Sequence, residues 1–338
     1  MGFYDRLEEL YGLPALTFPA QGSSAALPAP DAVAWRITGQ PDAVAWRFSE
    51  GEPLPEEECW DEVFDRFCTE VDTTRVRALI VGNWGDPDDM DPSDAITALL
   101  AARDRLPALR SLFLGDIVAE ECEISRISQT DVTPLLAGFP ALEEFGVRAG
   151  EGNLMGEALR LEFPALRHDV LRSLTVQSGG LPADVVRGVG ASELPALEHL
   201  DLWLGISEYG ADCEVADLEP FLSGARFPRL RHLALRNSER QDEIAAAVAS
   251  APVVARLEVL DLSMGTLSDD GATALLAGQP LTHLQKLDLH HNFLSERFQH
   301  RIRETLEPAG VEVDVDHGDA EQDEGDSGTV QRYVSVGE

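Results

Sequence analysis

Leucine recurs along most of this chain at fixed positions, in the pattern Leu-x-x-Leu-x-Leu. Two clear copies begin at Leu257 and Leu284, and a short helical pattern at 268–278 lies between them and ends in glycine. From residue 76 onward, successive copies begin 33, 33, 29, 26, 33, 27 and 27 residues apart. A strand followed by a helix at each such interval is typical of a leucine-rich repeat, in which every unit buries its leucines against its neighbours.

Each copy predicts one strand, and the segment before the next copy predicts one helix. The expected strands begin at Val76, Leu109, Leu142, Leu171, Leu197, Leu230, Leu257, Leu284 and Gly310. Proline in the repeated LPAL and FPAL segments, and glycine after several helices, stop each helix before the next strand. We therefore predict an α/β leucine-rich-repeat solenoid, a horseshoe of about 9–10 strands with a parallel concave sheet and outer helices.

The N-terminal end is predicted to carry a hairpin cap. The sequence DAVAWR occurs at 31–36 and again at 42–47, and both copies alternate in the manner of strands. We expect the second copy to lie beside the strand at Val76 and the first to cover the exposed edge, which a solenoid must protect. Residues 1–30 are expected to form an extension that begins amphipathically and continues as irregular coil.

A single repeat domain is therefore expected at 31–316, with its N-terminal cap at 31–75. Residues 317–338 form an acidic tail whose first part is too rich in Asp, Glu and Gly to bury a core. Residues 330–336 alternate again. They either return as an antiparallel capping strand over the last repeat or stay loose.

The charge of the chain narrows the classes of partner. A formal net charge of −35 repels nucleic-acid phosphates and anionic lipid surfaces, so we expect neither nucleic acid nor membrane as partner. The natural complement is a basic protein or peptide, although the acidity could also serve solubility alone. The acidic N-terminus does not resemble a signal peptide, which favours a cytoplasmic protein. The four cysteines lack metal-ligand spacing, so we expect free thiols and no cofactor.

The concave face offers the candidate binding residues. Strand side chains alternate, so the residues on either side of the second leucine of each repeat point to that face. The candidates for partner binding are His199, Asp201, Trp203, His232, Arg236, Asp261, Lys286, Asp288 and His290. Trp203 and Arg236 should be neighbours on adjacent strands, and such side chains are common interaction anchors. Alternatively, Trp203 folds down onto Leu204 or a neighbouring repeat.

We find none of the short motifs of nucleotide-binding or hydrolytic enzymes in the sequence. The chain is therefore predicted to be a non-catalytic binding protein for a protein or peptide. One alternative is a metal-dependent enzyme or hydrolase that uses His199, Asp201 and His232. Another is a purely structural subunit.

The 27-residue units, above all LEVLDLSMGTLSDDGATALLAG, resemble the ribonuclease-inhibitor-like class of leucine-rich repeats. The longer units, with their GNWGD and LWLG turns, resemble an uncharacterised bacterial leucine-rich-repeat family from GC-rich genomes. That resemblance implies a helper in a modification pathway, encoded beside radical-SAM-type and ATP-grasp-type enzymes. The chain has few cysteines and irregular units, so ribonuclease binding does not carry over.

Overall fold

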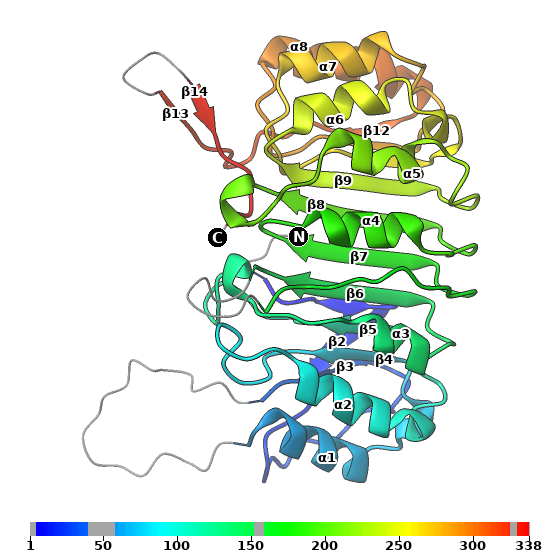
Figure 1. Cartoon of the computed structure of the whole chain (residues 1–338), viewed down its shortest axis with the longest axis vertical. Helices are drawn as coiled ribbons and strands as arrows, with labels where there is room; N and C mark the ends of the chain where they lie inside the picture. The colour runs from blue at the N-terminus through cyan, green and yellow to red at the C-terminus, as the bar shows by residue number, and fades with distance from the viewer. Residues whose placement is uncertain (1–4, 40–57, 152–158, 325–329, 338) are drawn as a thin grey trace. The chain divides into compact units, whose positions relative to one another are not determined.

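The computed structural model describes residues 5–39, 58–151, 159–324 and 330–337. These residues divide into two compact units, the first ending at Glu162 and the second beginning at Phe163. In each unit, strands of a mostly parallel sheet alternate along the chain with helices that lie on one side of that sheet (Figure 1). The predicted α/β repeat architecture with a parallel sheet is thus confirmed. None of the helices in the described residues is long and apolar enough to cross a membrane.

The first unit contains six sheet strands. They are β1 (Glu9–Leu10), β2 (Leu13–Thr17), β3 (Ala34–Ile37), β4 (Ala78–Val81), β5 (Ser111–Leu114) and β6 (Glu144–Ala149), with helices α1 (Trp60–Glu70), α2 (Ser93–Ala101) and α3 (Thr133–Gly138). Three short 3-10 helices, η1 (Thr73–Arg75), η2 (Arg103–Arg105) and η3 (Ile124–Arg126), complete it. Strands β2 to β6 are parallel, and β1 pairs with β2 in the antiparallel sense.

The second unit continues the same alternation. Its parallel strands are β7 (Ser173–Ser178), β8 (His199–Gly205), β9 (His232–Ser238), β10 (Val259–Asp261), β11 (Lys286–Asp288) and β12 (Glu312–Asp314). The helices are α4 (Ala183–Ala191), α5 (Glu219–Leu222), α6 (Gln241–Val248), α7 (Asp269–Ala277) and α8 (Glu296–Leu306). Shorter 3-10 segments are η4 (Ser207–Tyr209), η5 (Val215–Leu218), η6 (Pro252–Arg256) and η7 (Glu307–Ala309).

The register of the strands explains why the leucine pattern is so regular. In the second unit, Leu174, Leu200, Leu233, Leu260, Leu287 and Val313 lie opposite one another on successive strands. Those five leucines have no exposed surface, so they form a continuous core between sheet and helices. The alternate residues of each strand must then point to the opposite face, which we call the inner face.

Each of the last repeats turns away from its strand through a left-handed residue. These residues are Asn237, Met264, His291 and Gly318, with φ of 56°, 65°, 48° and 56°, and they recur every 27 positions. The N–H groups of Asn237, Met264 and His291 donate to carbonyls of the next repeat over 2.7–2.9 Å. Asparagine and glycine tolerate this conformation, whereas methionine adopts it at a cost of about 1 kcal/mol.

The predicted arrangement of the N-terminal cap is wrong. The first DAVAWR copy supplies β3, which lies parallel to and directly beside β4, with Trp35 opposite Leu79. It therefore occupies the place assigned to the second copy, and residues 42–47 lie outside the described residues. The edge beyond β3 is covered by β2 and then β1. Both come from residues 1–30, which were expected to be an amphipathic opening followed by irregular coil, so the sheet begins earlier than predicted.

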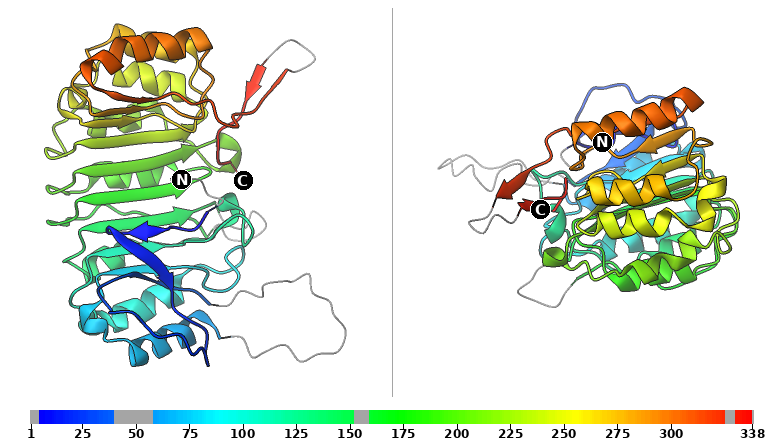
Figure 2. Two further views of the ribbon diagram at one scale, coloured as in Figure 1. Left: turned by 180° about the vertical axis from the view of Figure 1, so that it is seen from behind. Right: turned by 90° about the horizontal axis from the view of Figure 1, so that it is seen from above.

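The N-terminal segment also covers the apolar inner face of the first unit. Leu10 is 6% exposed and packs with Ala34, Ala78, Ile80 and Phe113, which all point to that face. Figure 2 shows the N-terminal strands of this unit crossing one side of its sheet. The sequence correctly placed small and apolar side chains here, but the chain itself fills the surface that they form.

The C-terminal residues do not extend the repeat sheet. Strand β14 (Val330–Arg332) pairs antiparallel with β13 (Gln322–Glu324) in a separate two-stranded sheet. Neither of the two alternatives for residues 330–336 describes this arrangement fully. Residues 330–332 do form an antiparallel strand, but it pairs with the acidic tail and not with the last repeat, with Gln322 opposite Arg332 and Glu324 opposite Val330.

Asp116 fastens the N-terminal segment to the first unit. Its carboxylate accepts hydrogen bonds from Arg36 Nε over 2.6 Å and from the Leu7 N–H over 3.1 Å. Its carbonyl accepts one from Arg6 Nη1 over 3.0 Å. The Asp116 side chain is fully buried and that of Arg36 is 7% exposed, so neither charge has water as an alternative partner.

We predict that Asp116→Ala lowers the free energy of unfolding by about 3–5 kcal/mol, because it leaves the Arg36 guanidinium buried without its counter-ion. Urea denaturation measures the loss, and trypsin should then cut after Arg6 much faster. Asp104→Ala, at a side chain that is 94% exposed, is the matched control and should change neither. Equal stability of the two variants would contradict the role given to Asp116.

Candidate functional site

The nine candidate residues all lie on the inner face of the second unit or directly beside it. Strand register places His199 beside His232, Trp203 beside Arg236, and Asp261 beside Asp288. The same register adds Asp314 next to Asp288. We call this set the polar strip: His199, Asp201, Trp203, His232, Arg236, Asp261, Lys286, Asp288, His290 and Asp314.

Arg236 is the centre of one half of the polar strip. Its Nε and Nη2 donate to the two carboxylate oxygens of Asp201 over 3.0 and 2.7 Å, and its Nη1 lies 3.5 Å from Asp261 Oδ2. Burial lowers the pKa of Arg236, but Asp201 and Asp261 outweigh it and raise the pKa above its usual value. Burial raises the pKa of Asp261, and the charge of Arg236 opposes that rise. The guanidinium therefore stays charged and fixed between two carboxylates.

The ring of Trp203 packs against the guanidinium of Arg236. The guanidinium carbon lies 5.0 Å from the centre of the Trp203 ring, a cation–π arrangement. Trp203 has no exposed surface, which decides between the two alternatives for it: the side chain is folded down rather than exposed as an anchor. Its Nε1 has no hydrogen-bond partner among the described residues. Arg236 and Trp203 thus serve to order the strip and are not free to bind a partner.

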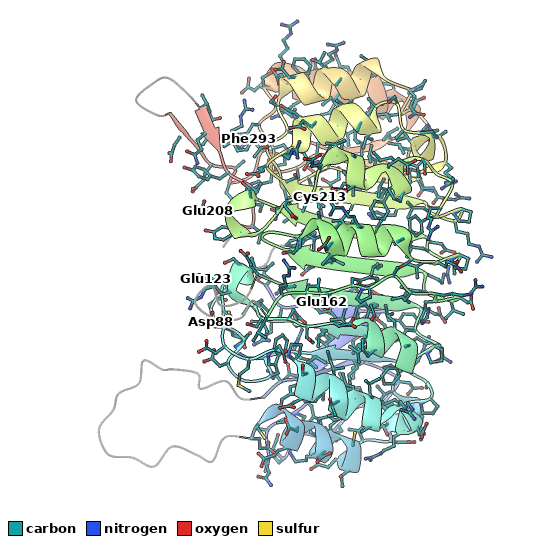
Figure 3. The ribbon with its side chains drawn as sticks, viewed as in Figure 1. Asp88, Glu123, Glu162, Glu208, Cys213 and Phe293 are labelled. Atoms are coloured by element: carbon teal, nitrogen blue, oxygen red, sulfur yellow. The ribbon has the colours of Figure 1, made fainter. Side chains whose placement is uncertain are left out.

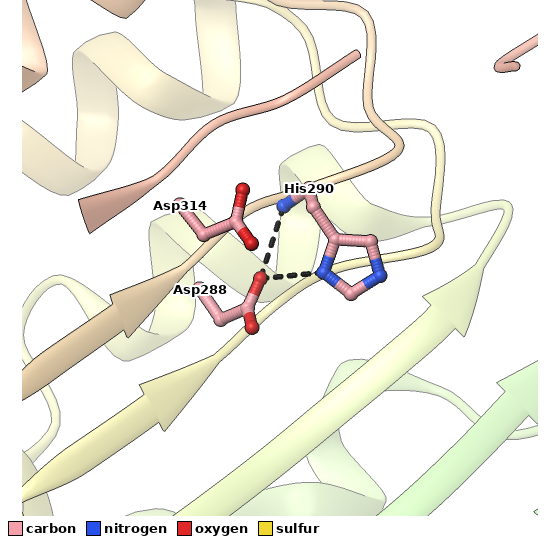
Figure 4. A group of neighbouring side chains, drawn as sticks. All are labelled: Asp288, His290 and Asp314. Atoms are coloured by element: carbon pink, nitrogen blue, oxygen red, sulfur yellow. Dashed lines mark hydrogen bonds and ion pairs between the residues drawn. The ribbon is translucent and has the colours of Figure 1, made fainter. Parts of the chain in front are cut away.

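Asp288 is the centre of the other half. Its Oδ1 lies 2.6 Å from His290 Nδ1 (Figure 4). Its Oδ2 lies 2.9 Å from Lys286 Nζ. Burial raises the pKa of Asp288, but the hydrogen bonds from His290 and Lys286 prevail and hold it well below its usual range. The same hydrogen bond raises the pKa of His290. Asp288 is therefore an anion that is paired with the Lys286 ammonium and hydrogen-bonded to His290.

The alternative metal site of His199, Asp201 and His232 is not among the described groups whose ligand atoms lie close together. The rings of His199 and His232 lie 5.2 Å apart at 39° to each other. Burial, against the opposing effect of Asp201, lowers the pKa of His232 to about 4, so this imidazole is neutral at pH 7. In the described part of the chain, the group whose ligand atoms lie within 4.8 Å of one another is instead Asp288, His290 and Asp314 (Figure 4). The ammonium of Lys286 beside Asp288 opposes a divalent cation there.

An acidic turn in the first unit is also occupied by its own chain. Asp88, labelled in Figure 3, is paired with the guanidinium of Arg126, and the Asp88 carbonyl accepts a hydrogen bond from Ser128 Oγ over 2.9 Å. Trp84 Nε1 donates to the carbonyl of Met90 over 2.8 Å. The side chains of Asp88 and Trp84 in this turn are therefore engaged by neighbouring residues of the same unit.

Two residues of the site, Met264 and Asp314, are absent from the nine candidates. Met264 lies with its sulfur 3.6 Å from Arg236 Nη1. Nothing in the sequence indicates this contact, because it depends on the left-handed backbone of Met264. Asp314 occupies the same repeat position as Asp288, on the predicted strand that begins at Gly310, although it is not among the nine candidates.

The fold and the polar strip define a class: a repeat protein of parallel strands and helices with paired charges on its inner face. No model of a known protein family matches the chain, and no curated protein matches it. The crystal structure of a protein from Bacteroides fragilis, a structural-genomics target, is similar, with a TM-score of 0.68 and 30% sequence identity. The match covers 75% of this chain and 70% of that one. The chain belongs to the same family as the Bacteroides fragilis protein. Membership of the bacterial leucine-rich-repeat family from GC-rich genomes stays a prediction.

We predict that Arg236→Met lowers the free energy of unfolding by about 3 kcal/mol at pH 7, because Asp201 and Asp261 then face each other without a cation. Loss of the cation raises the pKa of Asp261 further. As pH falls through that raised value, Asp261 takes up a proton in the folded state and the penalty shrinks. Urea denaturation at pH 7 and pH 5 measures both effects. Arg103→Met, at a side chain 59% exposed, should be neutral at both pH values; a pH-independent loss for Arg236→Met would refute the account.

We predict that His290 and His232 titrate far apart. His290 should titrate above 6.5 because Asp288 stabilises its charged form, and His232 near 4. The contribution of the His290–Asp288 pair to stability is full below 6.5 and is lost as pH rises through the folded pKa of His290. NMR titration of the imidazole protons measures both values. Asp288→Asn should lower the pKa of His290, whereas Asp319→Asn, which removes a partner of His291, should not.

Proposed function

We propose that the second unit is a non-catalytic binding module that takes a basic protein or peptide segment along its polar strip. The observation that carries this proposal is the row of carboxylates brought into register by β10, β11 and β12. Asp261, Asp288 and Asp314 are neighbours across those strands. A row of fixed carboxylates at the spacing of strands, about 4.8 Å, suits the side chains of an extended basic segment.

The accessible negative charge lies at the β12 end of the strip. Asp201 and Asp261 are neutralised by Arg236, and Asp288 by Lys286 and His290. By contrast, the Glu312 side chain is 73% exposed and lies 3.8 Å from the only lysine of the chain. Asp316 is also exposed, and Asp314 is partly so. A basic segment would therefore meet this end first and extend along the strip toward Asp201.

The geometry favours binding over catalysis. Ser263, whose N–H donates to Asp261 of the strip, has no exposed surface and therefore cannot reach a substrate as a nucleophile. His232 is neutral at pH 7 and His290 is held by Asp288. The charges of the strip are paired with one another, which suits specificity and steering of a charged partner. Under the family resemblance, that partner would be an enzyme or a substrate of a modification pathway.

We predict that octa-arginine, used as a probe, binds the full chain with an affinity that falls steeply with salt. Glu312→Lys combined with Asp316→Lys should weaken this binding at least about tenfold, because it reverses the accessible end of the strip. Isothermal titration calorimetry at low and high salt measures both effects. The matched control is Glu304→Lys with Glu307→Lys, which makes the same change of charge at α8 and η7.

Equal weakening by both double variants would show that the probe responds to net charge alone and would refute the strip as the binding surface. Stoichiometric zinc retained through dialysis, and lost in His199→Ala with His232→Ala, would favour the metal-dependent enzyme instead. The two experiments are independent, since the zinc assay uses neither the probe nor the charge-reversed residues.

A further inference from the structure

The last residues of the chain return to the repeat sheet and are held there like a bound peptide. After β14, the Ser335 N–H donates to the carbonyl of Met264 over 2.9 Å. The next residue, Val336, is only 2% exposed. Its side chain and main chain are therefore enclosed by the repeats.

Asn237 supplies most of that receptor. Its Oδ1 accepts the Val336 N–H over 3.0 Å, and its Nδ2 donates to the Val336 carbonyl over 2.6 Å. One side-chain amide thus satisfies both main-chain groups of a single residue, as a neighbouring strand would. Hydrogen bonds of this kind recognise the extended main chain of a bound segment and not its side chains.

Asn237 is also held by the repeats themselves. It is the left-handed residue near the end of β9, and its own N–H donates to the carbonyl of Ser263, just after β10, over 2.9 Å. Its Nδ2 also donates to the carbonyl of Ser178, at the end of β7, over 3.3 Å. The first bond holds the backbone of Asn237, and the second helps to orient its side-chain amide.

The surroundings of Val336 and Gly337 decide which side chains a bound segment can carry at these two positions. Val336 fills a buried position, so an aliphatic residue is needed there. At Gly337, an added Cβ would make ordinary van der Waals contact with the ring of Tyr209 at 3.4 Å and with Ile206 at 3.7 Å, so this position does not require glycine. Ser335 contributes only its N–H to the contact with Met264.

We propose that the Asn237 pocket is a peptide-binding site, for which the C-terminal residues 334–337 act as a built-in, exchangeable ligand. Its partner in trans is an extended segment of another protein with a valine-like residue at the position of Val336. The proposal is independent of the polar strip, because it rests on main-chain hydrogen bonds and one apolar side chain instead of on charge.

The tethered segment sets how strongly a partner must bind. A ligand that is covalently attached to its receptor has an effective concentration of about 1 mM. A free copy of the segment with a Kd of about 100 μM would then be weakened about tenfold by the tethered one. The intact chain should therefore bind a free peptide poorly, and a chain whose own segment cannot seat should bind it well.

The test uses a fluorescein-labelled peptide with the sequence of residues 331–338, titrated with full-length Val336→Asp protein and with the wild type. Fluorescence polarisation should show binding at least about tenfold tighter to the variant. Adding Asn237→Gly to Val336→Asp should abolish the binding, because glycine keeps the left-handed backbone but removes the amide. A peptide with aspartate in place of its valine should not bind.

Failure of a folded Val336→Asp protein to bind the peptide would overturn the proposal, since the segment would then be only a part of the fold. If Val336→Asp does not fold, Ser335→Pro, which removes one main-chain donor, takes its place. Loss of folding in both variants would overturn the proposal in the same way. A wild-type dimer that Val336→Asp abolishes would also overturn it, because the partner would then be a second copy of the chain.

Discussion

The register of the parallel strands is the constraint on which the rest of the structure depends. A shift of one residue would turn Leu200, Leu233 and Leu260 from the core onto the inner face, so the register is strongly specified. Once the leucines are fixed, every residue between them is fixed too. Side chains that are 35 residues apart, such as Asp201 and Arg236, are thereby forced into contact. The geometry of the polar strip is a consequence of core packing.

The inner faces of the two units carry different kinds of side chain. On the inner face of the first unit the register gathers apolar side chains around Phe113, and the N-terminal segment covers them. On the inner face of the second unit the register gathers carboxylates, and the cations of Arg236, Lys286 and His290 are interleaved between them. An uncovered apolar face would favour aggregation, and an uncompensated acidic one would repel itself. The covering segment in the first unit therefore prevents aggregation, and the interleaved basic residues in the second unit reduce repulsion between carboxylates.

The sequence predicts what is periodic and misses what is not. Strand positions from Val76 onward, the inner-face residues and the contact between Trp203 and Arg236 all follow from a spacing that can be read directly. The sheet strands before β4 do not, because β1 and β2 lack the leucine pattern and are recruited by burial against Phe113 and by Asp116. The burial of Trp203 is likewise unreadable, since it depends on which neighbour covers the ring. The Asn237 pocket cannot be predicted from the sequence either, because one side-chain amide there joins two residues that are 99 positions apart.

Both ends of the chain are held by the repeats, but by forces of different kinds. The N-terminal segment buries apolar side chains and is tied by the Arg36–Asp116 ion pair, whose separation would leave two charges in a dry environment. Residues 334–337 are held by main-chain hydrogen bonds and one valine, and water can replace each of those hydrogen bonds when the segment leaves. Breaking the first set opens the core of a unit, whereas breaking the second exposes one small pocket. The N-terminal segment is therefore part of the fold, and the C-terminal segment has the energetics of a ligand.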